Sequence, residues 1–183
     1  MKAVNFKQLI KIIFAAVIMA FLLRTFVVDG FIVSGDSMSP SILEDDYIFI
    51  DRISYLFSEP KRGDIVVVQP RSSSAKIIKR VIGLPGERIS VSDIDGNLHL
   101  KSDRRDAGIV LVEDYLNFPY MTPNVGISEI KLDPKEYFVL GDNRFISIDS
   151  RELGPVDRWD IKGKVFFLVR IKSLSVKFLN NLY

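Results

Sequence analysis

Residues 76–86 read "KIIKRVIGLPG", a short apolar run that carries Lys79 in its middle and ends at a Pro-Gly turn. Its length and its isoleucine and valine content predict a β-strand. Along a strand, Lys79 shares one face with Ile77 and Val81, so its amine would lie among apolar side chains. Most strand lysines lie at the surface and discourage edge-to-edge aggregation, so the run taken alone favours that structural role.

Similar short runs recur along the rest of the chain. They are "DYIFIDRI" at 46–53, "GDIVVVQP" at 63–70, "ERISVSDIDGNLHLK" at 87–101, "EYFVLGDN" at 136–143 and "GKVFFLVRI" at 163–171. Turn signals separate them, and no long amphipathic helix interrupts them, so we expect a mainly β fold with an antiparallel, barrel-like core. We expect this core to comprise 29–91 and 135–183. The less patterned, turn-rich segment 92–134 would form a small inserted cap subdomain.

The N-terminal segment from Ile12 to Val28 is largely apolar and carries one charge, Arg24; its 17 residues are at the short end of the about 17–25 residues that span a bilayer. Three lysines precede it, and the first acidic residue of the chain is Asp29. This charge asymmetry predicts that residues 1–28 form a basic cytoplasmic N-terminus and one transmembrane helix, with the rest of the chain outside. A cleaved signal peptide and a buried core helix are the alternatives, but no small-x-small cleavage site follows the run.

The composition excludes several kinds of chemistry. The chain has 183 residues, a net charge of +2, no cysteine and one histidine, His99. The small net charge gives no sign of a nucleic-acid partner, and the lack of cysteine removes disulfides and thiolate nucleophiles. His99 lies in the second half of an expected hairpin, and a zinc site needs more ligands than one histidine. We therefore expect no metal and no cofactor.

Residues 33–42, "VSGDSMSPSI", contain four serines, at positions 34, 37, 39 and 41. Such a run is usually a loop, but one of its hydroxyls could act as a nucleophile if a base lies nearby. A solvated lysine is only about 0.04% neutral at pH 7, whereas burial lowers its pKa. Lys79, in its apolar strand, is thus the candidate base, and Lys76, which follows the polar "RSSSA", is the weaker one.

A third polar run, "VLGDNRFISIDSR" at 139–151, follows directly after an expected strand. Its oxygen atoms could bind a metal, although the spacing matches no calcium loop. Alternatively, the run braces an active site, with Asp149 and Arg151 paired and Ser147 positioned to orient an amine.

Five segments together resemble the bacterial type I signal peptidases, also called leader peptidases. They are "SGDSMSP", "RGDIVVV", "IKRVIGLPGE", "YFVLGDNRFISIDSRELGPV" and "IKGKVFF", in this order behind the apolar N-terminus. The resemblance implies a membrane-anchored Ser-Lys endopeptidase that cleaves signal peptides from exported preproteins after small-x-small sites. It places the enzyme in the bacterial plasma membrane, with the catalytic domain on the outer face.

The resemblance also implies roles for single residues. Ser37, directly before methionine, would be the nucleophile and Lys79 the general base. Ser147 would hydrogen-bond the lysine amine, supported by Asp142, Asp149 and Arg151. The expected substrate-binding residues are Phe31, Val33, Gly35, Met38 and Ile78.

The expected partners are signal-peptide-bearing preproteins and the lipid bilayer, with the secretion translocon as a further candidate. Two departures stand out. Gly35 occupies a position where several relatives have a serine that donates to the oxyanion, and Phe145 and Ile146 replace residues that are commonly polar. The alternatives are a specialised, conjugation-type peptidase with a single substrate and a membrane-tethered β-domain that binds peptides without cleaving them. The predicted anchor disfavours a soluble, self-cleaving Ser-Lys repressor domain.

Overall fold

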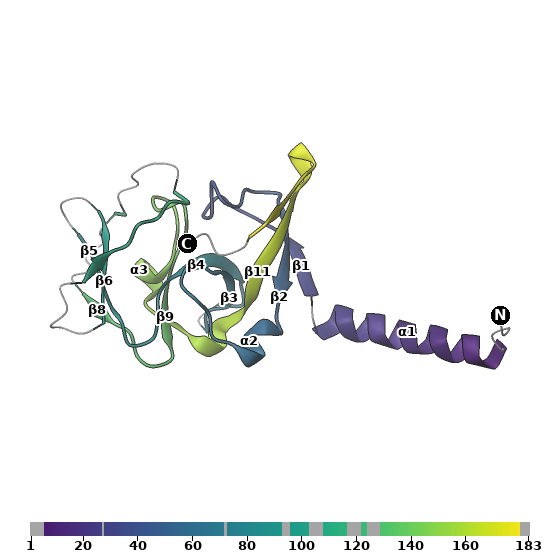
Figure 1. Cartoon of the computed structure of the whole chain (residues 1–183). Helices are drawn as coiled ribbons and strands as arrows, with labels where there is room; N and C mark the ends of the chain where they lie inside the picture. The colour runs from purple at the N-terminus through teal and green to yellow at the C-terminus, as the bar shows by residue number, and fades with distance from the viewer. Residues whose placement is uncertain are drawn as a thin grey trace.

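The computed structural model describes residues 6–26, 28–71, 73–92, 96–102, 108–116, 122–123 and 129–179. Within these ranges the protein is mainly β, as predicted, with helix α1 ahead of two antiparallel sheets (Figure 1). The helices are α1 (Phe6–Phe26), α2 (Ser54–Phe57) and α3 (Ser150–Leu153). The strands are β1 (Val28–Ile32), β2 (Tyr47–Asp51), β3 (Ile65–Val68), β4 (Ile77–Gly83), β5 (Arg88–Val91), β6 (Leu98–Lys101), β7 (Ile109–Val110), β8 (Ile130–Lys131), β9 (Glu136–Leu140), β10 (Val156–Asp157), β11 (Ile161–Arg170) and β12 (Ser175–Phe178).

The larger sheet has the strand order β1-β2-β11-β3-β4-β9-β10, with β12 paired to β11. Strand β11 is long enough to pair with β2, β3 and β12, and its register shifts twice, between Ile161 and Gly163 and between Val165 and Phe167. Such irregularities bend a strand and increase its twist. In the strand order given above, β1 is an edge strand, while β4 lies inside the sheet.

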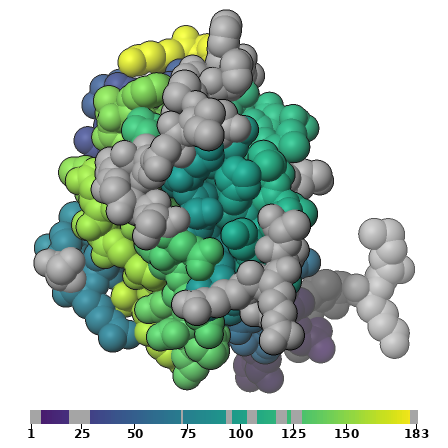
Figure 2. All heavy atoms as spheres, turned by 90° about the vertical axis from the view of Figure 1, so that its left-hand side faces the viewer, coloured from purple at the N-terminus to yellow at the C-terminus, as the bar shows by residue number. Residues whose placement is uncertain are grey.

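The four-stranded sheet has the order β7-β6-β5-β8 and packs on the end of the larger sheet that carries β9 (Figure 1). A buried cluster joins Ile82, Phe138 and Leu140 of the larger sheet to Ile89 and its neighbours in β5 and β6. The two layers approach closely at Gly83, where an added Cβ would lie 2.0 Å from Ile89 Cδ1. Figure 2 shows this end of the molecule, with the teal to green residues of β5 and β6 beside later, yellow-green segments.

The expected boundary at residue 92 falls inside this arrangement, because β5 precedes residue 92 and pairs with β6. The division into a core and an inserted cap stays a prediction.

Helix α1 extends away from the sheets (Figure 1). In the part of the chain that the structure describes, no helix combines the length and the apolarity needed to cross a membrane, so the predicted anchor is not confirmed.

Candidate active site

Ser37 lies in the loop that connects β1 to β2. Two flanking apolar side chains, Met38 and Ile42, are buried in the core of the larger sheet and fix this loop in place. The amide of Ile42 donates to the carbonyl of Met38, which closes a tight turn directly after Ser37. Gly35 has a φ of +90°, a conformation that favours glycine, and no atom lies within 4 Å of the place where its Cβ would be. Ser37 thus lies on a turn that its buried neighbours hold in place, next to unfilled space at Gly35.

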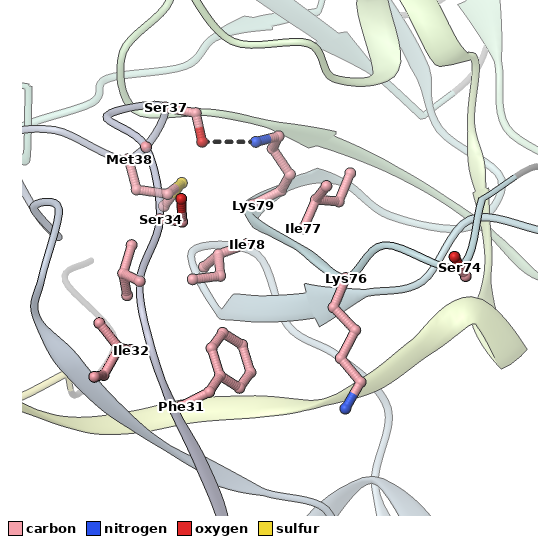
Figure 3. Close-up of a pocket in the computed structure, with 12 residues that line it drawn as sticks. Phe31, Ile32, Ser34, Ser37, Met38, Ser74, Lys76, Ile77, Ile78 and Lys79 are labelled. Carbon is pink, nitrogen blue, oxygen red and sulfur yellow. Dashed lines mark hydrogen bonds between the residues drawn. The ribbon is translucent and has the colours of Figure 1, made fainter.

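Lys79 projects from β4 toward this turn, and its Nζ donates a hydrogen bond to Ser37 Oγ at 2.9 Å (Figure 3). Only 3% of the lysine is exposed. Burial lowers the pKa of Lys79 to about 8, although the carboxylates of Asp149 and Asp142 oppose the shift. Among the described residues, Lys79 forms no ion pair. The structure therefore brings together a hydroxyl and an amine that is partly neutral near pH 7, which is what a Ser-Lys nucleophile needs.

Arg80, the next residue of β4, is also buried, but unlike Lys79 it is paired with a carboxylate. Its guanidinium forms a buried, two-pronged ion pair with Asp142, with Nε–Oδ1 and Nη2–Oδ2 distances of 2.8 and 2.6 Å. It also donates to the carbonyl of Gly63 and to Ser41 Oγ. This arginine thereby connects β4 to both polar loops of the site. The sequence analysis did not identify Arg80. It could have done so, because a second cation inside an apolar strand would be buried and a buried charge requires a partner.

The loop at 139–151 contacts the nucleophile turn directly, because the amide of Asn143 donates to the carbonyl of Ser37 at 3.0 Å. Asp149 is fully buried and accepts hydrogen bonds from the amide of Gly141 and from the guanidinium of Arg151, the latter at 2.9 Å. Despite the opposing cost of burial, these donors hold the pKa of Asp149 below its usual value. Asp149 and Arg151 therefore brace the loop as a charged pair.

Ser147 is buried in the same loop, but in the described part of the chain its Oγ makes no hydrogen bond to Lys79. The hydrogen bond to the lysine amine that the resemblance implies is not formed here. Ser147 packs closely against Gly141, where an added Cβ would lie 2.2 Å from Ser147 Oγ and 2.5 Å from the carbonyl oxygen of Ser37. Gly141 is thus a second residue that sequence reasoning missed, and only a glycine lets the two loops approach this closely.

A cavity of about 460 Å³ opens beside Ser37 and Lys79 (Figure 3). All five expected substrate residues line it, namely Phe31, Val33, Gly35, Met38 and Ile78. Five further lining residues were not predicted: Ile32, Ser34, Ser74, Lys76 and Ile77. The walls come from β1 with its extension and from the start of β4.

Both walls offer strand edges. Strand β1 ends the larger sheet, and the described residues 77–79 of β4 pair only with β3, because β9 pairs with β4 from Arg80 onward. An extended peptide between two such edges can form main-chain hydrogen bonds on either side.

Other chemistry finds less support in the geometry. Over the described ranges, no three histidine, aspartate or glutamate side chains converge as a metal site would require. His99 lies in β6 of the smaller sheet, opposite Ser90 of β5, and does not line the cavity beside Ser37.

A family model described as "Signal peptidase, peptidase S26" matches residues 6–170. The chain is 37% identical over 165 residues to "Probable signal peptidase I-2" of Synechocystis sp., covering 87% of this chain and 71% of that protein. It is 36% identical over 171 residues to "Signal peptidase I P" of Bacillus subtilis subsp. natto, covering 88% of each. A crystal structure of a signal peptidase I from Enterococcus faecalis aligns with a TM-score of 0.45 and 30% identity, over 58% of this chain and 97% of that one.

The titration of Lys79 predicts a specific pH dependence of stability. Between its folded pKa of about 8 and its ordinary value of 10.5, the unfolded chain holds a proton that the folded chain lacks. The free energy of unfolding therefore rises with pH by about 1.4 kcal/mol per unit in this window. Lys79→Met has nothing to titrate at this position, so the free energy of unfolding of the wild type should rise relative to that of the variant as the pH rises through the window. Urea denaturation at several pH values measures the difference.

Lys76→Met is the matched control, because the Lys76 side chain is 45% exposed. Its stability should follow that of the wild type across the same pH range. A constant difference between Lys79→Met and the wild type would show that Lys79 keeps an ordinary pKa.

Proposed function

The chain belongs to the bacterial type I signal peptidase family of serine peptidases, and from that premise we propose that it cleaves signal peptides after small-x-small sites with Ser37 as nucleophile and Lys79 as base. The observation that carries the proposal is the 2.9 Å contact between Lys79 Nζ and Ser37 Oγ in a buried setting. The family membership confirms the resemblance expected from the five sequence segments.

In the proposed reaction, neutral Lys79 accepts the Ser37 hydroxyl proton as Oγ attacks the scissile carbonyl carbon. The backbone N–H of Ser37 would donate to the oxyanion that forms. Collapse of the tetrahedral intermediate breaks the C–N bond, and Lys79 returns the proton to the leaving amine. Water then hydrolyses the acyl-enzyme by the same steps, with Lys79 again as base. Asp142, Asp149, Arg151 and Ser147 would hold the two loops around these groups.

The cavity supports the proposed substrate class. A signal peptide would lie extended between β1 and the start of β4 and complete the main-chain pairing of both edges. Side chains of an extended strand alternate, so residues −1 and −3 from the scissile bond would face the same wall. Phe31, Val33, Met38 and Ile78 make that wall apolar, which fits the small apolar side chains of the proposed cleavage site.

We further propose that the N-terminal segment anchors the enzyme in the plasma membrane, with the catalytic domain outside and exported preproteins as its partners. Support comes from the apolar run between Ile12 and Val28 and from the lysines before it. The exposed apolar side chains at the described start of α1, such as Phe14 and Val17, are consistent with a lipid environment. The proposed anchor predicts that extraction of membranes with alkaline carbonate leaves the full-length protein in the membrane pellet. Its release into the supernatant would contradict the anchor.

The catalytic assignment predicts that Ser37→Ala and Lys79→Ala each lower kcat/KM by at least about 10³-fold on a preprotein with an Ala-x-Ala site. For the wild type, kcat/KM should rise with pH through about 8, because protonated Lys79 cannot accept the serine proton. Steady-state cleavage assays with purified protein measure both effects.

Ser39→Ala and Lys162→Ala serve as controls, since neither residue contacts the cavity. Full activity of either dyad variant would disprove that residue's role. A wild type that binds the preprotein without cleaving it would favour a non-cleaving peptide-binding domain.

A further inference from the structure

The floor of the cavity changes from apolar to charged along its length. On β1 and its extension, Asp29, Phe31 and Val33 alternate and therefore share a face. On the opposite wall, Ile78 of β4 and Lys76, the residue directly before β4, both line the cavity. Val33 and Ile78 are buried in one core cluster, and Phe31 packs against it. The row of apolar side chains that begins beside Ser37 thus ends at Lys76, which lines the cavity, and at Asp29, the next residue of this face of β1.

Lys76 lines this end of the cavity and forms an ion pair with Asp29, which lies just beyond the lining residues. The distance between Lys76 Nζ and Asp29 Oδ2 is 3.8 Å, and the two side chains are 45% and 43% exposed. Figure 3 shows Lys76 at the end of the cavity away from Ser37 and Lys79, with its amine turned outward. The other carboxylate oxygen of Asp29 accepts from the amide of Gly30. The contact is long and solvated, so either side chain can turn toward a third group.

We infer that the Asp29–Lys76 pair forms the subsite for the fifth residue before the scissile bond; this rests on the proposed function. A substrate strand advances about 3.3 Å per residue and points every second side chain at the floor. If residue −1 lies beside Val33, residue −3 lies near Phe31, and residue −5 faces Asp29 and Lys76. The apolar floor selects small side chains at −1 and −3, and the pair controls the charge accepted at −5.

The two partners compensate each other in the wild type, because a charged residue at −5 meets one like charge and one opposite charge. Removal of one partner leaves the other alone at the subsite. Lys76→Met should then favour lysine over glutamate at −5, and Asp29→Asn should favour glutamate over lysine. For partly exposed charges we expect a shift of roughly three- to five-fold in each direction.

The experiment uses full-length protein and two preproteins that differ only at −5, one with glutamate and one with lysine. The measured quantity is the ratio of their kcat/KM values, so effects common to both substrates cancel. The expected ratio moves in opposite directions for K76M and D29N and returns toward the wild-type value in the double variant. The shifts should shrink as NaCl is raised, because salt screens exposed charges.

K172M is the matched control, since Lys172 also forms an exposed ion pair, with Asp45, and neither of these two residues lines the cavity. Its ratio should equal that of the wild type. If all variants cleave both preproteins with the wild-type ratio, the subsite assignment is wrong while the peptidase assignment stands. If the wild type cleaves neither preprotein, the proposed function fails, and the subsite assignment fails with it.

Discussion

A buried lysine that lacks a carboxylate partner is the constraint on which the site depends. Strand β4 carries two consecutive buried cations, and the structure treats them differently. Arg80 is neutralised by two short hydrogen bonds to Asp142. Lys79 meets only the hydroxyl of Ser37 among the described side chains within hydrogen-bond range, so the cost of burying its charge lowers its pKa. Because burial disfavours the charged form of Lys79, part of the amine is neutral near pH 7 and can act as a base.

The surrounding contacts keep this unfavourable arrangement in place. Asp142 forms its ion pair with Arg80 rather than with Lys79. Asp149 forms an ion pair with Arg151 and accepts a hydrogen bond from the amide of Gly141. Neither carboxylate is left to form an ion pair with the lysine, although both oppose its deprotonation from a distance. The amide of Asn143 holds the carbonyl of Ser37, which ties the nucleophile to the same loop. One set of buried hydrogen bonds therefore fixes both the position and the protonation of the reacting pair.

The sequence predicted those features that depend on residues close together along the chain. The strands follow from short apolar runs, and Lys79 could be identified as a base candidate because its neighbours in sequence are apolar. Partners distant in sequence were not accessible: Arg80 pairs with Asp142, 62 residues away, and the space at Gly141 depends on how two loops pack. The hydrogen bond expected between Ser147 and Lys79 is absent, because a residue-by-residue resemblance transfers identity but not side-chain geometry. The ion pair between Asp29 of β1 and Lys76, directly before β4, likewise joins two segments that the sheet does not pair directly.

The most direct test of this account is the pKa of the Lys79 amine itself. Protein labelled with ¹³C at the ε position of lysine would be titrated by NMR, and the Lys79 signal would be assigned by its loss in K79M. The account predicts a midpoint near 8, well below the ordinary lysine value of 10.5. A Lys79 midpoint near the ordinary lysine value of 10.5 would show that the amine is charged at neutral pH and would contradict its role as the base.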